Sequence, residues 1–303
     1  ANTTIQASGA GSRIDLSHLE TFYGGGEYQS SSYPYPWYYY TTNVNVLDGG
    51  EVDLAGAISH RNSFTVDGVG SVLDVAGVTS VAGASITVQA GNVVTFGSLS
   101  SLVNVSLYAK DAAKILFPVA TSYTGYNSAD TTIEANGAGS RIDLSHLETF
   151  YGGGEYQSGS YPYPWYYYTT NVKALAGGEV DLAGAISHRN NITVDGTGSV
   201  LGVAGITKLG GTVLTVNIPG TLTFSSATEV TDSSLTAPAD VVLAFTAATT
   251  LKNVNLTATG GGDILFPVAT SYTGYNYANT TIQASGAGSR IDLSHLETFY
   301  GGG

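Results

Sequence analysis

The chain of 303 residues contains no cysteine and no methionine. Without cysteine, a disulfide framework and thiolate metal sites are excluded. Without an initiating methionine, the chain is expected to be a processed product or a piece of something longer, and we favour a segment of a longer, repetitive protein. Basic residues are also scarce, since 10 Lys and Arg stand against 23 Asp and Glu and leave a net charge of −13. Such a chain lacks the basic patches that bind nucleic acids or anionic membranes, so we expect neither as a partner.

Long apolar runs are missing too, so the sequence predicts no membrane insertion. Glycine is abundant instead, with 40 residues, and 43% of the chain is hydrophobic. The apolar positions recur at short intervals along the whole chain, which predicts a large buried core rather than disorder. No long window shows the 3.6-residue period of a helix, so the fold class is predicted to be all-β.

Two repeat periods organise the chain. The segment TTIQASGAGSRIDLSHLETFYGGG begins at Thr3 and returns almost unchanged at Thr131 and Thr280, at spacings of 128 and 149 residues. The difference of 21 residues equals one shorter repeat, such as the segment from Ser233. A one-dimensional stack accepts one extra unit without disturbing its neighbours, whereas a globular core does not.

The short repeat therefore predicts one continuous parallel β-solenoid over residues 1–303. It is expected to have about twelve coils of 21 or 22 residues, stacked at the roughly 4.8 Å spacing of paired strands. The large repeats cover residues 3–130, 131–279 and, in part, 280–303. Each large repeat is expected to span six or seven coils.

Alternation within each coil predicts which side chains face the core. In the segment RIDLS, Ile14 and Leu16 are expected to point inward. The matching inward pairs are Val52 and Leu54, Leu73 and Val75, and Val94 and Phe96. A second inner column is expected to contain Ile5, Val44, Val66 and Val88.

The coil pattern, x-φ-x-φ-x-G-x-G-S-x-φ-D-φ with φ an apolar residue, resembles that of right-handed parallel β-helix surface proteins. These are bacterial proteins of the filamentous haemagglutinin and autotransporter-adhesin kind. The resemblance covers essentially the whole chain, but its pattern is general, so no specific family is assigned and no functional residue is carried over. It implies an elongated scaffold or adhesin that is extracellular or on the cell surface.

Two kinds of tyrosine-rich insert interrupt the coils. The long insert covers residues 24–40 and recurs at 152–168, and the short insert SYTGYN covers 122–127 and recurs at 271–276. Both are expected to leave the same edge of the solenoid, one coil apart, and to form an aromatic cluster. The candidate partner-binding residues are Tyr28, Tyr33, Tyr35, Trp37, Tyr38, Tyr39, Tyr40, Tyr123, Tyr126, Tyr156, Tyr161, Tyr163, Trp165, Tyr166, Tyr167, Tyr168, Tyr272 and Tyr275.

Three uses of these inserts compete. They could cover their own rod, join rods or successive subunits of a filament, or bind glycans, since tyrosine combines a large apolar face with a polar tip. Because a repeated patch suits a repeated partner, we favour a structural filament or cell-surface rod. Its partners would be other copies of the chain, end to end or side by side. The alternative is a carbohydrate-binding adhesin, and a polysaccharide-degrading enzyme comes third.

Acidic residues form one outward column, with Asp15, Asp53 and Asp74 in successive coils. Carboxylates stacked in register repel one another, and a divalent cation such as Ca²⁺ would relieve the repulsion. Pairing with basic neighbours, such as Arg13 aligned with Glu51, is the favoured alternative, so we predict no cofactor.

Histidine occurs only in the repeats, and His18 lies near Asp15 and Glu20. This trio could be drawn as an acid–base site. An enzyme rarely needs the same site at every repeat, however, so the sequence predicts a protein that is not an enzyme.

Overall fold

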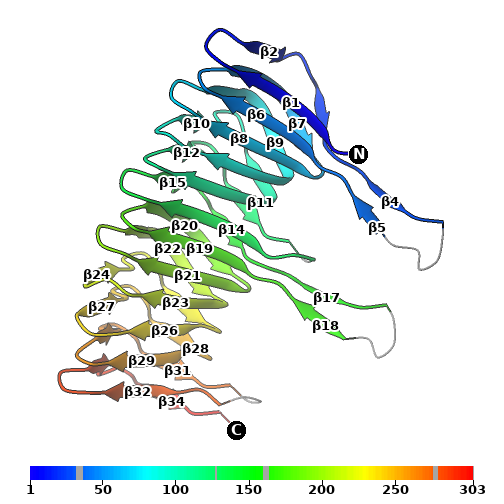
Figure 1. Cartoon of the computed structure of the whole chain (residues 1–303). Coiled ribbons are helices and arrows are strands. Elements are labelled where there is room, and N and C mark those ends of the chain that lie inside the picture. The colour runs from blue at the N-terminus through cyan, green and yellow to red at the C-terminus, as the bar shows by residue number, and fades with distance from the viewer. Residues whose placement is uncertain (32–36, 127, 160–163, 276–278, 303) are drawn as a thin grey trace.

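The computed structural model describes residues 1–31, 37–126, 128–159, 164–275 and 279–302. Within these ranges the chain is all-β and winds into a rod of stacked coils, with two hairpins projecting from one edge (Figure 1). The strands of the rod pair in parallel from coil to coil, so the predicted parallel solenoid is confirmed. None of the described segments is a helix long and apolar enough to cross a bilayer.

Each coil has three straight segments, so the rod has three faces. The first face stacks twelve strands or strand ends in the described chain, which matches the predicted number of coils. They are β1 (Thr3–Ser8), β6 (Thr42–Leu47), β8 (Asn62–Asp67), the end of β9 (Val72–Val88), the end of β11 (Ser101–Lys110), β14 (Thr131–Asn136), β19 (Thr170–Leu175), β21 (Asn190–Asp195), β23 (Thr212–Val216), β26 (Ser234–Ala237), β29 (Asn255–Thr259) and β32 (Ile282–Ser285).

The second and third faces complete each coil. The second face contains β2 (Arg13–Leu16), β10 (Val93–Thr95), β12 (Lys114–Leu116), β15 (Arg141–Leu144), β24 (Gly220–Thr223), β27 (Val241–Ala244), β30 (Asp263–Leu265) and β33 (Arg290–Asp292). The third face contains β3 (Thr21–Tyr23), β13 (Ser122–Thr124), β16 (Thr149–Tyr151), β25 (Glu229–Thr231), β28 (Thr250–Lys252), β31 (Ser271–Thr273) and β34 (Thr298–Tyr300). Longer strands turn the corner between these two faces, namely β7 (Glu51–Ser59), β9, β20 (Glu179–Ser187) and β22 (Val200–Gly210).

The pairing corrects the expected length of the large repeat. β14 lies five coils beyond β1, and β32 lies six coils beyond β14. The estimate of six or seven coils was one too high, because the tyrosine-rich inserts consume residues without adding a coil. The two repeats still differ by one coil, as the 21-residue difference indicates.

The core is a set of stacked apolar columns. On the second face, Ile14, Val52 and Leu73 are in register, as predicted. On the first face the predicted column is wrong by two residues, because Val44 pairs with Phe64, and Val66 pairs with Val46. Inward positions recur every two residues, so alternation alone cannot detect a two-residue slip.

The third face shows that two candidate binding residues are core residues instead. Tyr123 and Tyr272 are almost fully buried, and the Tyr123 ring stacks on Phe150 at a centroid distance of 4.7 Å. The Tyr123 hydroxyl donates to the Val105 carbonyl (2.9 Å). In the strand SYT the flanking Ser122 and Thr124 point outward, so alternation turns the tyrosine into the rod.

Candidate functional site

The long inserts fold into two antiparallel β-hairpins, which we call the aromatic arms. The first arm pairs β4 (Glu27–Gln29) with β5 (Trp37–Tyr39), and the second pairs β17 (Glu155–Gln157) with β18 (Trp165–Tyr167). Both arms leave the same edge of the rod, next to the third face (Figure 1). The sequence predicted inserts at these places but did not predict that they form strands.

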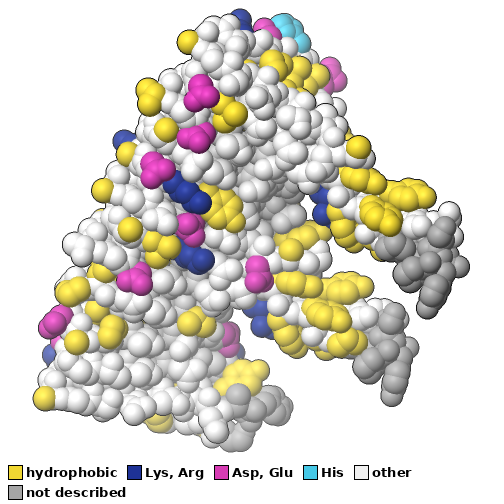
Figure 2. All heavy atoms as spheres, viewed as in Figure 1, with side chains coloured by type: hydrophobic (Ala, Val, Ile, Leu, Met, Phe, Trp, Pro, Cys, Tyr) yellow, Lys and Arg dark blue, Asp and Glu magenta, His cyan; other side chains and the backbone are white. Residues whose placement is uncertain are grey.

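Both faces of each arm carry aromatic side chains. Tyr28 and Tyr38 lie opposite each other on one face, with ring centroids 6.3 Å apart. Trp37 and Tyr39 lie on the other face by alternation. These side chains are about half exposed, with 51% for Trp37 and 55% for Tyr39, and the same holds in the second arm. Figure 2 shows the arms as apolar projections with open space between them. A half-exposed aromatic on either face is typical of a surface that binds a partner.

An arginine fixes each arm at its root. The Arg61 guanidinium lies 4.1 Å from the Tyr39 ring centroid and 3.7 Å from a Glu27 carboxylate oxygen. Arg189 repeats the arrangement at 4.0 Å from the Tyr167 ring and 3.4 Å from Glu155. Each cation–π contact of this kind stabilises by about 0.5–1 kcal/mol. Both arginines belong to the following coil, so each of them ties the arm to that coil.

A close backbone approach explains the glycines at the root of each arm. A Cβ on Gly25 would lie 1.8 Å from the Tyr40 carbonyl oxygen, and one on Gly153 would lie 2.0 Å from the Tyr168 carbonyl oxygen. The two chain segments of the arm therefore meet where only glycine fits.

The short insert supports the second arm from the preceding coil. The Gly125 amide donates to the Tyr151 carbonyl (2.8 Å), and the Gly154 amide donates to the Tyr126 carbonyl (3.0 Å). The prediction that the two inserts emerge on one edge, one coil apart, is confirmed.

The predicted partner-binding residues fall into three groups. Most described ones lie on the arms or at the edge of the rod, and those on the paired strands are the most exposed. Tyr123 and Tyr272 are in the core, as described above. Tyr33, Tyr35, Tyr161 and Tyr163 lie outside the described residues.

Sequence reasoning missed Arg61 and Arg189. The sequence signal for both arginines is the motif SHRN, which recurs one coil after each long insert. A basic residue that recurs in so acidic a chain is unusual.

An arginine pairs with part of the acidic column in the structure. Asp15, Asp53 and Asp74 are in register, as predicted. Arg13 lies 2.5 Å from Asp53 and 3.2 Å from Glu51. Its hydrogen bond to Asp53 raises the pKa of Arg13. Among the residues described, no group of three His, Asp or Glu side chains is arranged to hold a metal ion. The absence of a cofactor, with Ca²⁺ at this column as the alternative, stays a prediction.

In the second large repeat, Arg141 takes the place of Arg13, at 2.7 Å from Asp181 and 3.3 Å from Glu179. Burial, with the charge of Asp181, raises the pKa of Glu179. The ion cluster is therefore a recurring structural element of the second face.

In the structure, Asp15 and His18 are linked through Ser17, a residue outside the suggested trio of His18, Asp15 and Glu20. The Ser17 hydroxyl donates to Asp15 (2.6 Å) and lies 3.3 Å from His18 Nδ1. The serine separates the carboxylate from the imidazole, whereas a carboxylate that orients a catalytic histidine hydrogen-bonds to its ring directly. Hydrogen bonds from the Ser17 hydroxyl and amide lower the pKa of Asp15, which is typical of a carboxylate that closes a turn.

Together these features define a parallel β-solenoid that resembles autotransporter adhesins and carries exposed aromatic arms. The chain is similar to the adhesin BmaC autotransporter of Brucella suis, with 29% identity over 153 residues. The similarity covers 48% of this chain and only 4% of that much longer protein. No family model and no solved structure matches the chain. The general likeness that the coil pattern indicated is thus confirmed, without a specific family.

Proposed function

We propose that the chain is part of a cell-surface, adhesin-like rod whose aromatic arms hold neighbouring rods together. The observation that carries this proposal is the pair of arms with exposed aromatics on both faces, leaving one edge of the rod. The likeness to an autotransporter adhesin supports an extracellular location at the cell surface. This role is mechanical and requires neither a catalytic group nor a cofactor.

The spacing of the arms supports another copy of the chain as the partner. The arms stand five coils apart, which is about 24 Å at the usual strand spacing. Each arm leaves one coil and returns to the next, so its two paired strands lie side by side along the rod and take up about 10 Å of its length. This leaves about 14 Å between the two arms, which is more than the roughly 10 Å that an arm of a second rod needs. The space between the arms therefore fits one arm of a neighbour.

The energy of such a contact favours many arms acting together. The four aromatics on the paired strands of one arm expose about 100 Å² each, which gives roughly 10 kcal/mol at about 25 cal/mol per Å² if all of it is buried. Association costs an estimated 4–15 kcal/mol, so one arm alone is marginal. A longer rod with arms at regular intervals gains from multivalency.

Sedimentation of the purified chain over a range of concentrations tests this proposal. We expect the natural chain to self-associate, and a variant with serine on the paired strands of both arms to stay monomeric. The substituted residues are Tyr28, Trp37, Tyr38, Tyr39, Tyr156, Trp165, Tyr166 and Tyr167.

The matched control replaces exposed valines of the rod by threonine at Val72, Val93, Val103 and Val200. It should associate like the natural chain. Equal association of the arm variant, or a natural chain that stays monomeric at high concentration, would refute the proposal.

A further inference from the structure

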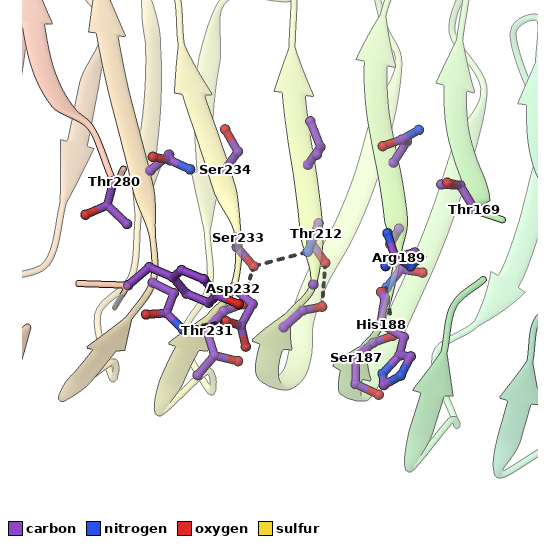
Figure 3. A pocket seen from close by; sticks show the side chains of 18 of the residues that line it. Thr169, Ser187, His188, Arg189, Thr212, Thr231, Asp232, Ser233, Ser234 and Thr280 are labelled. Carbon is purple, nitrogen blue, oxygen red and sulfur yellow. Dashed lines mark hydrogen bonds between the residues drawn. The ribbon is translucent and has the colours of Figure 1, made fainter. Parts of the chain in front are cut away.

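A groove of about 720 Å³ lies below the second arm, at the edge between the third and first faces. It extends along the rod axis from Glu155 at the root of the arm to Tyr275 of the short insert. In Figure 3, His188 and Arg189 stand on one side, Thr231 and Asp232 stand on the other, and Thr212 lies between them. A volume of this size is within the usual range of small-molecule sites.

The groove exists because two adjacent corner residues have no side chain. His188, Gly211 and Asp232 occupy the same corner in successive coils, all with positive φ. A Cβ on Gly211 would come within 2.7 Å of the His188 backbone, and one on Gly210 would lie 3.0 Å from the Thr231 hydroxyl. The floor of the groove is therefore backbone, while side chains form its walls.

Hydrogen bonds and ring contacts hold the polar walls in place. The Asn253 amide donates to the Asp232 carboxylate (2.7 Å), and the Ser233 hydroxyl accepts from the Thr212 amide (3.2 Å). On the opposite side, His188 stacks on Tyr151 at 4.0 Å. The walls thus present carboxylate, amide and hydroxyl groups with an aromatic residue, Tyr275, at one end.

The two large repeats differ at this groove. Ile58 and Ile186 are equivalent and pair with Val81 and Leu209, so Ala82 is the counterpart of Gly210. By the same register, Val103 and Asn104 stand in place of Thr231 and Asp232.

The second repeat has thus lost a side chain from the floor and gained a hydroxyl and a carboxylate on the wall. By contrast, the long inserts from residue 24 to 40 and from 152 to 168 differ at one residue, Ser31 against Gly159. The polar change therefore concerns the groove and not the arm beside it.

We propose that this groove binds a neutral oligosaccharide of hexopyranose units. Carboxylate and amide groups match the neighbouring hydroxyls of a sugar as acceptors and donors, and these bonds are strongest with the charged carboxylate. The tyrosine ring suits the apolar face of a pyranose. A chain with net charge −13 disfavours anionic sugars, and a groove along the rod axis suits a linear ligand.

Calorimetric titration with maltotriose, cellotriose, mannotriose and triacetylchitotriose tests the proposal, with trigalacturonate as the anionic comparison. The protein is kept below the concentration at which rods associate, so the result does not depend on the arms. At least one neutral trisaccharide should bind. Asp232→Asn and Gly210→Ala should each weaken binding about tenfold or more, because one removes the charged acceptor and the other fills the floor.

Both substitutions introduce the residue of the first repeat, so the fold has already accepted them, and circular dichroism checks this. The matched controls Asn104→Ala and Ala82→Gly should leave binding unchanged. The proposal is overturned if no neutral trisaccharide binds at millimolar concentration. It is also overturned if trigalacturonate binds more tightly or if the two groove variants bind like the natural chain.

Discussion

Tyr123 shows how position within a strand decides the role of a residue. Tyrosine is a residue type common in binding surfaces, yet Tyr123 is buried among the aromatic residues of the third face. Its hydroxyl donates a hydrogen bond to the Val105 carbonyl. Burial raises the pKa of Tyr123 to about 12. The buried phenol therefore resists ionisation and couples stability to alkaline pH.

We predict that Tyr123→Phe reverses its effect on stability between neutral and alkaline pH. Near pH 7 the variant should be about 1 kcal/mol less stable, because it loses a buried hydrogen bond. Above pH 10 the unfolded phenol loses its proton while the folded one keeps it until about pH 12. The natural chain therefore loses up to about 3 kcal/mol as the pH rises through this window, and the variant does not.

Urea unfolding at a series of pH values measures this crossover. Comparison with the phenylalanine variant cancels the titration of the exposed tyrosines and lysines. A stability difference that stays constant from pH 8 to about pH 12 would show that the buried phenol is not the cause.

At the scale of elements, the sequence predicted the location of the arms but not their structure. The sequence indicates only where the inserts lie, because the segments EYQ and WYY are too short to indicate strands by alternation. Their pairing depends on the glycines at the root and on the arginine from the next coil, which are long-range contacts. The inward columns were predictable on the second face because the corner glycines show where each strand begins, and this fixes which residues align from coil to coil. On the first face the sequence does not mark the alignment in this way, so the predicted alignment was wrong by two residues, as at Phe64.

We predict that Arg61→Ala together with Arg189→Ala loosens both arms while leaving the rod intact. Each substitution removes a cation–π contact and an exposed ion pair, so an arm should lose about 1 kcal/mol of anchoring. Amide hydrogen exchange should become faster at residues 27–29, 37–39, 155–157 and 165–167, with no change in the inner columns. Lys114→Ala on the second face provides the control, since its side chain is distant from the arms, and exchange in the arms should remain as in the natural chain.

The whole molecule is a stack of coils, and one coil can be added without disturbing the pairing of the others. The second large repeat has six coils and the first has five, and pairing continues through the extra coil, as Val213–Ser234 and Ser234–Asn255 show. The sequence predicted this property well, because the spacing of near-identical segments counts coils directly. What it could not give was the number of coils in each large repeat, since inserts and coils both add residues.

We predict that deletion of residues 233–253 gives a folded rod that is one coil shorter. The deletion removes 21 residues, so Asn255 takes the place of Ser234 in the register. Circular dichroism per residue should be unchanged, and the melting temperature should fall by only a few degrees because each coil contacts only its neighbours. Deletion of residues 233–242 is the control and should disrupt the rod at the junction, because removal of half a coil brings strands of different faces together there.

The central claim is that the arms join rods by inserting into one another's spaces, and cryo-electron microscopy of the purified chain tests it most directly. We expect rods paired along the edge that carries the arms. One arm of each rod should lie between two arms of its neighbour, whose own arms are about 24 Å apart. Rods that pair through the second face, or that remain single at concentrations where the chain sediments as a multimer, would contradict the account.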